Sequence, residues 1–330
     1  MHIRQYLKTV FSNLTGSFHW IGQHNVGEQI QFLNVQEKNS LKHIDIIEKN
    51  IDQIRKNLIE LHYEIHKDEG KKYSDELNYL QSQDFLPMIP YKQKKHLEFV
   101  PNAEYDNNKK LPFIVHKGKR LYFPATWSLE SVKNQYQYYI ERENLVGGGY
   151  TDKAPHQYQS DSLKISTGDI LLDIGSAEGL LALDTIETTK RIFLFESDAM
   201  WIAPLEATFE PYKEKVSIIN KYVSDSNSAT TTTLSNAIQG FKDETFFVKM
   251  DIEGAEEFVI KENSDFFKQN QIKLACCTYH KKDHYQSINA ILEKWGYMTH
   301  PSDGYILCFM YNDFMPPFFR RGVIRATNIT

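Results

Sequence analysis

The sequence has little cysteine. Its three cysteines, Cys276, Cys277 and Cys308, are too few for a disulfide framework and lack the C-x-x-C spacing of many zinc sites. Two of them are adjacent, so on a strand their side chains would point to opposite faces. Because this usage is typical of a reducing compartment, we expect a cytoplasmic protein.

Long apolar runs and an excess of positive charge are also missing. No stretch approaches the roughly 18 apolar residues of a membrane-spanning helix, and the N-terminus lacks the apolar segment and cleavage site of a secretory signal. The net charge is −5, which leaves no basic surplus to neutralise a phosphate backbone. We therefore expect no transmembrane segment and no nucleic-acid partner.

What is present is typical of a globular protein larger than one ordinary domain. The chain has 330 residues, of which 41% are hydrophobic and 25% charged. Changes in composition and in the spacing of apolar residues divide the sequence into four parts: a helical region over 1–82, a connector over 83–150, an α/β domain over 151–312 and a C-terminal tail over 313–330.

The first part predicts two helices, over residues 1–21 and 26–68. The second helix contains an apolar seam whose spacings alternate between three and four residues, as in a coiled coil. This seam could join copies of the chain into a homo-oligomer through residues 44–65, or could pair with another helix of the same chain. Its members are Ile44, Ile47, Ile51, Ile54, Leu58, Leu61 and Ile65.

The connector predicts a hairpin and a helix. Phe113–His116 and Arg120–Phe123 flank a Lys-Gly-Lys turn and would form the hairpin. The helix over 128–144 would begin at the capping residue Ser128 and stop at the glycines of 147–149.

From residue 164 onward, short β-rich apolar runs alternate with helical stretches. This alternation predicts a parallel sheet covered by helices on both faces. Ligands of such sheets bind at the carboxyl ends of the strands, so we expect the chemistry directly after each run. The runs are Ile170–Ile174, Arg191–Phe195, Val216–Ile219, Thr245–Met250, Ile272–Thr278 and Tyr305–Met310.

Two features after these runs predict a nucleoside site. Gly175 and Gly179 lie at a strand-to-helix turn, where the absence of a Cβ lets the backbone approach a ligand. Glu196 ends the next run, where a carboxylate can accept hydrogen bonds from ribose hydroxyls.

The glycine spacing distinguishes between cofactors. A dinucleotide site uses G-x-G-x-x-G to hold a pyrophosphate, whereas here Glu178 lies where phosphate charge would fall. S-adenosyl-L-methionine has no phosphate and carries a cationic sulfonium and ammonium, so nearby carboxylates such as Asp173 favour it.

Five segments resemble the FkbM-type methyltransferases over residues 165–310. They are DIGSAEG, FLFES, IINKYVSD, VKMDIEGAE, and TYHKKDH followed by INAILEKWGY. The resemblance implies an α/β fold with the Rossmann-like, seven-stranded sheet of class I methyltransferases. The last strand of that sheet runs antiparallel to the others, and Tyr305–Met310 would form it after Met298–Pro301.

The resemblance also implies the roles of individual residues. Glu196 would hold the ribose, with Ser197 beside it, and Tyr222 and Val223 would line the adenine side. Asp251 would stand at the mouth of the fourth strand and contribute to the cofactor site. The cofactor loop would consist of Asp173, Gly175, Ser176 and Gly179.

Methyl transfer to a hydroxyl requires alignment and removal of a proton. His280 follows the fifth strand and could act as general base, with Asp251 or Glu253 orienting it or accepting the proton. Those two acids could also hold a divalent ion, although we predict no metal.

The resemblance points to O-methylation of a small-molecule or glycan acceptor, either a sugar or a secondary metabolite. Two other functions stay open. One is a nicotinamide-dependent oxidoreductase on a similar sheet, which thermal stabilisation by NAD would indicate. The other is a non-catalytic, oligomeric module, which cofactor binding without turnover would indicate.

Overall fold

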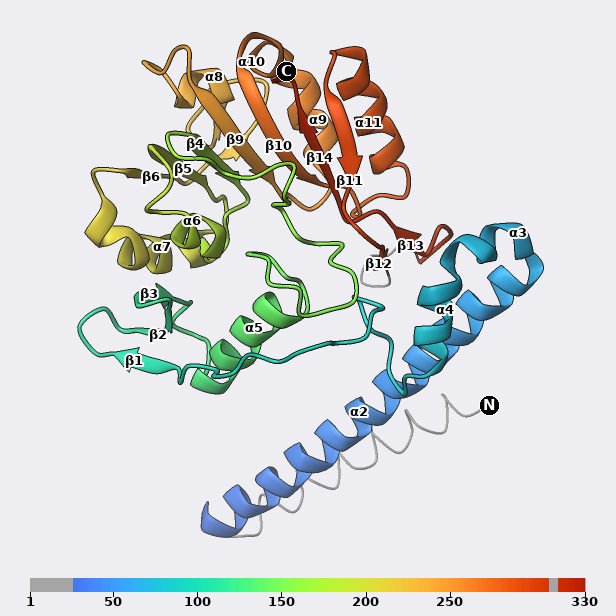
Figure 1. The fold of residues 1–330 in the computed structure, drawn as a ribbon. Helices are drawn as coiled ribbons and strands as arrows, with labels where there is room; N and C mark the ends of the chain where they lie inside the picture. Colours follow the sequence, from blue (N-terminus) through green and yellow to red (C-terminus); the bar gives the residue numbers. More distant parts are fainter. Residues whose placement is uncertain (1–25, 309–313, 330) are drawn as a thin grey trace. The chain divides into compact units, whose positions relative to one another are not determined.

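A computed structural model describes residues 26–308 and 314–329. By compactness the chain divides into Met1–His66 with Gln83–Leu86, and Lys67–Ser82 with Pro87–Thr330. The described part of the first unit is dominated by helix α2 (Val26–Ile65), which confirms the helix expected over 26–68 (Figure 1). The helix expected over 1–21 lies outside the described residues.

The apolar seam of α2 is exposed in the single chain. Each residue of the seam keeps at least 40% of its surface accessible. A continuous row of large apolar side chains at this exposure is typical of a surface that meets a partner. The coiled coil and the homo-oligomer stay predictions, because exposure alone does not identify the partner.

The second unit begins with short helices and a small sheet. The helices are α3 (Lys67–Gly70), η1 (Lys71–Tyr73) and α4 (Ser74–Gln81). The sheet contains β1 (Glu104–Asp106), β2 (Leu111–His116) and β3 (Lys119–Tyr122), in that order.

Strands β2 and β3 confirm the predicted hairpin. They pair antiparallel across Lys117 and Gly118, both of which have positive φ, as a tight two-residue hairpin turn requires. Helix α5 (Leu129–Glu141) follows, and the Ser128 hydroxyl caps it by accepting a hydrogen bond from the backbone N–H of Ser131 at 3.0 Å. The helix expected over 128–144 is therefore confirmed.

A seven-stranded mixed sheet forms the centre of this unit. Its spatial order is β11-β14-β10-β9-β4-β5-β6. Strand β14 runs antiparallel to both of its neighbours, and the pairs from β10 to β6 are parallel. The strands are β4 (Ile170–Ile174), β5 (Arg191–Phe195), β6 (Val216–Ile219), β9 (Thr245–Met250), β10 (Gln271–Cys277), β11 (Met298–Pro301) and β14 (Val323–Thr327).

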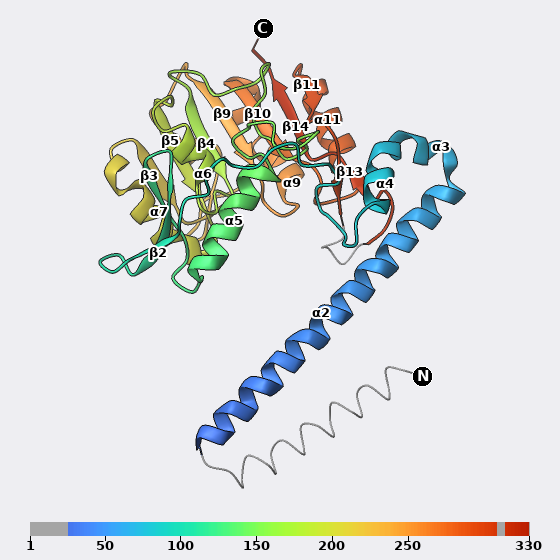
Figure 2. The same ribbon diagram turned by 60° about the horizontal axis from the view of Figure 1, so that its bottom comes forward.

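Helices cover both faces of this sheet (Figure 2). Because side chains alternate along a strand, Leu171 and Cys277 contribute to one core, and Leu172 and Cys276 to the other. The first core includes α5, α6 (Leu180–Asp184) and α7 (Ile202–Phe209), with η2 (Ala199–Trp201) and η3 (Glu210–Tyr212) beside α7. The second core includes α8 (Leu234–Ala237), α9 (Glu256–Glu262), α10 (Ser264–Gln269) and α11 (His284–Lys294).

The prediction for the last strand is wrong. The run expected over Tyr305–Met310 contributes only β12 (Ile306–Leu307), which pairs with β13 (Phe319–Arg320) outside the main sheet. The antiparallel strand is β14, within the segment expected to be a tail. The short apolar core of β14 is interrupted by Arg325, so its sequence gives a weaker strand signal than the aromatic and aliphatic run before it.

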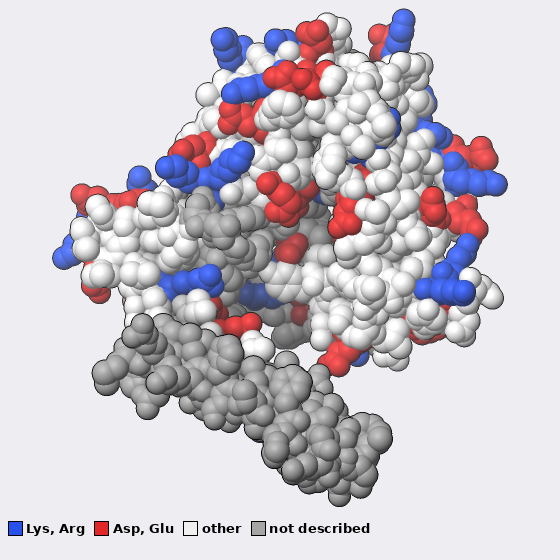
Figure 3. All heavy atoms as spheres, turned by 180° about the vertical axis from the view of Figure 1, so that it is seen from behind, with Lys and Arg blue, Asp and Glu red and all other residues white. Residues whose placement is uncertain are grey.

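Strands β7 (Tyr222–Val223) and β8 (Thr231–Thr232) form a short parallel pair. Among the described helices, none is long and apolar enough to cross a membrane. On the described part of the face in Figure 3, basic and acidic side chains are interspersed.

Candidate active site

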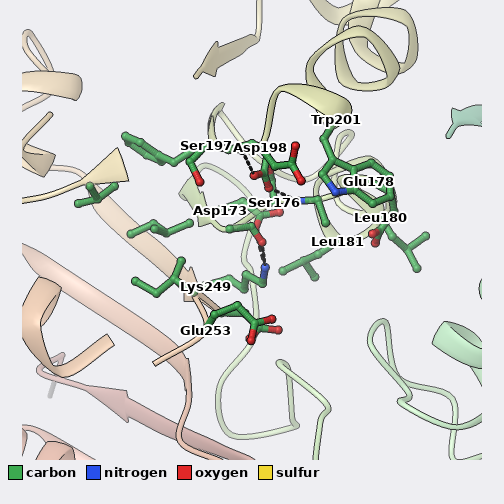
Figure 4. Close-up of a pocket in the computed structure, with 18 of the residues that line it drawn as sticks. Asp173, Ser176, Glu178, Leu180, Leu181, Ser197, Asp198, Trp201, Lys249 and Glu253 are labelled. Carbon is green, nitrogen blue, oxygen red and sulfur yellow. Dashed lines mark hydrogen bonds and ion pairs between the residues drawn. The ribbon is translucent and has the colours of Figure 1, made fainter. Parts of the chain in front are cut away.

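A cavity of about 560 Å³ opens at the carboxyl ends of the central strands (Figure 4). Its walls come from the loops after β4, β5, β6 and β9, from the end of α5 and from the segment between α5 and β4. Of the residues predicted for the site, His280 and Gly179 are not among those lining the cavity. The predicted residues that line it are Asp173, Gly175, Ser176, Glu196, Ser197, Tyr222, Val223, Asp251 and Glu253.

The two loop glycines are needed for contacts within the protein. Gly175 has φ +76°, and a Cβ there would lie 2.0 Å from the backbone oxygen of Asp251. Gly179 precedes α6 with the same φ, and its Cβ would meet the Phe209 ring at 2.8 Å. The first glycine therefore lets the loops after β4 and β9 touch, and the second lets α6 begin against α7.

Glu196 is fixed beside this loop by backbone hydrogen bonds. Its carboxylate accepts from the N–H of Ala177 and from the N–H of Asp198, each at 2.8 Å. The side chain is 8% exposed and lines the cavity. Since an ionised carboxylate has about four acceptor positions, two remain for a ligand.

A buried ion pair crosses the floor of the cavity between neighbouring strands. Lys249 Nζ lies 3.1 Å from Asp173 Oδ1 and also donates to the Gly175 carbonyl. Burial raises the pKa of Asp173, and the charge of Lys249 opposes that rise. Nearby, the buried Ser176 hydroxyl has no hydrogen-bond partner among the described residues. A buried hydroxyl of this kind costs free energy unless a ligand or a water satisfies it.

Glu178 lines the same cavity and is itself buried. Burial raises its pKa to about 7, so its carboxyl is only partly ionised near neutral pH. Its expected repulsion of a pyrophosphate is correspondingly weaker than a full charge would give.

Asp251 lies between two histidines. Its Oδ2 is 3.3 Å from His156 Nε2 and accepts a hydrogen bond from the Tyr158 hydroxyl at 3.0 Å, while its Oδ1 is 3.3 Å from His280 Nε2. Burial opposes ionisation of Asp251, but these partners and Lys249 outweigh it and lower its pKa well below the usual range. Asp251 is therefore a stable anion and a weak base.

The two histidines have carboxylates on their far sides. His156 Nδ1 is 3.0 Å from Glu143 Oε2, and His280 Nδ1 is 2.7 Å from Glu256 Oε1. Burial disfavours a charge on His156, yet Glu143 and Asp251 raise its pKa to about 10. The pKa of His280 is also raised: burial opposes the charge, and Glu256 and Asp251 favour it.

The structure brings the three predicted catalytic residues together, with His280 Nε2 3.3 Å from Asp251 Oδ1 and 3.8 Å from Glu253 Oε2, but only two of them line the cavity. Asp251 and Glu253 line the cavity, and the Glu253 side chain is 77% exposed. His280 is buried behind Asp251, in contact with Glu256 at the start of α9. It can affect the cavity through Asp251, whose position it helps to hold.

Several residues of the cavity were missing from the predicted site. His156 and Tyr158 come from a loop upstream of the resembling segments, and Tyr139 and Glu143 come from the end of α5 and the turn after it. The Pro-His-Gln-Tyr sequence at 155–158 predicts two alternatives for the first two, either closing over the cofactor or the substrate or packing in the protein. Nothing in the local sequence marks Glu143, because only the fold brings it to His156.

The sheet order and the antiparallel position of β14 define a class I methyltransferase fold, as the sequence predicted. Within it, residues 202–298 match the family model described as the methyltransferase FkbM domain, so the resemblance seen in the sequence is confirmed over these residues. Among curated proteins, none matches the sequence.

The solved structures that are similar to part of this chain include several methyltransferases. A methyltransferase FkbM from Methylobacillus flagellatus KT is 17% identical with a TM-score of 0.41, covering 51% of this chain and 46% of that protein. A precorrin-6y C5,15-methyltransferase from Geobacter metallireducens GS-15 is 16% identical with a TM-score of 0.33, and the match covers 50% of this chain and 81% of that protein. A putative RNA methyltransferase from Pyrococcus horikoshii is 15% identical with a TM-score of 0.31, covering 49% and 74%. Likenesses of this size say nothing about substrate.

Proposed function

We propose that this chain transfers the methyl group of S-adenosylmethionine to a hydroxyl of a sugar, a glycan or a secondary metabolite. The observation that carries the proposal is the cavity at the carboxyl edge, where Glu196 and the loop after β4 face a common space. Its carboxylates suit a cofactor that carries a sulfonium and an ammonium group and has no phosphate.

The cofactor's adenosine fits the β5 side of the cavity. Glu196 retains acceptor positions for the two ribose hydroxyls, with Ser197 beside it. Tyr222 is 63% exposed and Val223 is buried. The adenine would therefore pack between the Tyr222 ring, which is free to reorient, and the Val223 side chain, which is held in place by the core.

The methionine end fits between the loops after β4 and β9. Asp173 and Asp251 provide negative charge there, and the buried Ser176 hydroxyl provides an unused hydrogen-bonding group.

The acceptor would enter from the side of α5 and the loop before β4. Tyr139, Tyr158, His156 and Glu143 line that side. Aromatic faces mixed with hydrogen-bonding groups suit a polyhydroxylated ring or a phenolic metabolite, since both have an apolar face and several hydroxyls.

During the reaction an acceptor oxygen would form a bond to the methyl carbon while the carbon–sulfur bond breaks, and the hydroxyl proton must leave. Asp251 is too weak a base for this role, so Glu253, exposed at the cavity mouth, is the carboxylate we assign to proton removal. His280, which we predicted as a general base, would instead position Asp251.

The seam of α2 supports a second proposal, that the chain associates with another copy of itself. Its heptad spacing and exposure over residues 44–65 favour a helical partner with the same pattern. A second copy of this chain presents that pattern by definition.

Calorimetric titration with S-adenosylhomocysteine tests the cofactor site, and isotope transfer from labelled S-adenosylmethionine to a panel of hydroxylated acceptors tests the reaction. We expect saturable binding and label in a methyl ether. Binding of NAD in preference to S-adenosylhomocysteine would contradict the proposal.

A further inference from the structure

The ring nitrogen Nε2 of His156 has three polar neighbours, which is more than a single N–H group can donate a good hydrogen bond to. It lies 3.3 Å from Asp251 Oδ2, 3.4 Å from Cys277 Sγ and 3.5 Å from the Tyr158 hydroxyl. A charge-assisted N–H···O bond is usually about 2.7–2.9 Å long. The cluster is therefore close-packed, but no single contact in it has the length of a strong hydrogen bond.

These distances match the edges of a tetrahedral metal site. With zinc about 2.0–2.2 Å from nitrogen and oxygen and about 2.3 Å from sulfur, a nitrogen and an oxygen ligand lie about 3.3 Å apart, and a nitrogen and a sulfur about 3.5 Å. The observed separations from Nε2 are 3.3 Å to Asp251 and 3.4 Å to Cys277. The donor atoms of all three residues lie within 4.8 Å of one another.

We propose that His156, Asp251 and Cys277 form a site for a divalent transition-metal ion of the zinc type. Nitrogen and thiolate donors favour such ions over magnesium or calcium, which bind oxygen ligands. This ion site differs from the all-carboxylate site considered from the sequence, because its thiolate and imidazole come from β10 and from the loop before β4.

Surrounding residues hold the ligands in the required orientation. Glu143 lies 3.0 Å from Nδ1 of His156, which leaves Nε2 facing the cluster, where the bound ion would displace the Nε2 proton and the thiol proton of Cys277 to solvent. His280 lies 3.3 Å from the other oxygen of Asp251. A carboxylate on the far nitrogen of a metal-binding histidine is a common arrangement, because it fixes the tautomer and the ring.

The fourth position of the ion would face the cavity. His156, Asp251 and Tyr158 all line the cavity, whereas Cys277 is completely buried behind them. Three protein ligands and one open position are typical of catalytic rather than structural zinc. Resting on the proposed methyl transfer, we infer that an acceptor hydroxyl oxygen occupies this position and that the ion lowers the pKa of that hydroxyl.

Cobalt titration of the full, metal-stripped chain tests the site without relying on activity. We expect one Co²⁺ per chain and a near-ultraviolet thiolate-to-cobalt charge-transfer band that Zn²⁺ abolishes. Cys277→Ser should lose this band, and His156→Gln should weaken Co²⁺ binding by more than the roughly 100-fold that loss of an outer partner can cost.

Cys276→Ser is the matched control. Cys276 is the adjacent thiol and is equally buried, but it faces the opposite core, so this variant should keep the band. Thermal melting identifies any variant that fails to fold, and His156→Gln keeps the test valid if Cys277→Ser is one of them.

The proposal is overturned if the wild-type chain binds no cobalt, or if the band survives in Cys277→Ser. Titration with S-adenosylhomocysteine separates the two ideas. A chain that binds this nucleoside but no cobalt refutes the ion site and leaves the methyltransferase proposal standing. A chain that binds cobalt but not the nucleoside supports the ion site and contradicts the methyltransferase proposal.

Discussion

The substitution Glu196→Gln tests the ribose contact. The carboxylate accepts a backbone hydrogen bond on each oxygen, from Ala177 and Asp198, both at 2.8 Å. Glutamine has one acceptor oxygen, so its NH₂ group would face one of these N–H donors, and the charge that strengthens bonds to ribose is lost. Hydrogen bonds to a charged group contribute about 1.5–3 kcal/mol each.

Loss of two such bonds to ribose hydroxyls, partly offset by water, should weaken binding by about 3 kcal/mol, or roughly 100-fold. Calorimetric titration with S-adenosylhomocysteine measures this directly. Glu206→Gln is the matched control, because Glu206 lies exposed on α7 and does not line the cavity. If Glu196→Gln folds and binds the nucleoside as tightly as the control does, the ribose contact is refuted.

Four other predictions concern stability, pH, turnover and assembly. Gly175→Ala places a Cβ 2.0 Å from a backbone oxygen at φ +76°, so urea unfolding should show a loss of about 3 kcal/mol or more; an unchanged midpoint would contradict this. Glu178 loses its proton near pH 4.5 when unfolded and near 7 when folded, so it lowers stability as the pH rises through that window; in Glu178→Gln, thermal melts should lack that decrease, and an unaltered pH slope would refute the assignment. His280→Gln should lower kcat by about 10-fold or more with little change in cofactor affinity, and full turnover would exclude His280 from the mechanism. Leu58→Glu, at a seam position that is 48% exposed, should reduce the mass measured by light scattering to that of one chain; a wild-type protein that is already monomeric would disprove the intermolecular coiled coil.

Much of the sheet was predictable because its central strands are buried on both faces. Such strands appear as continuous apolar runs, and the predicted bounds of Ile170–Ile174 and Thr245–Met250 coincide with β4 and β9. The hairpin of β2 and β3 was predictable for a different reason. Its tight turn at Lys117 and Gly118 requires positive φ, and the glycine in the sequence marks a position that adopts it readily.

Strand β14 could not be recognised from local sequence. It is the last strand in the chain but is inserted between β10 and β11, so its neighbours are distant in sequence. This part of the chain was expected to be a tail, yet Arg325 of β14 and Arg320 of β13 are buried and donate to backbone carbonyls. A buried arginine whose partners are carbonyls of other loops carries no signal in its own segment.

The candidate site was predictable where strand ends deliver residues directly. Asp173, Glu196 and Asp251 follow β-rich runs, and the parallel sheet brings them to one edge. The pair of His156 and Glu143 depends on packing of the segment before β4 against that edge. No sequence period or motif connects these two residues, so only the tertiary structure brings them to Asp251.

A crystal structure of the complex with S-adenosylhomocysteine tests the central claim most directly. We expect the ribose hydroxyls against the Glu196 carboxylate, the amino-acid end near Asp173 and Asp251, and the sulfur facing the side of Tyr158. An empty cavity at saturating ligand, or a nucleoside bound elsewhere on the chain, would contradict it.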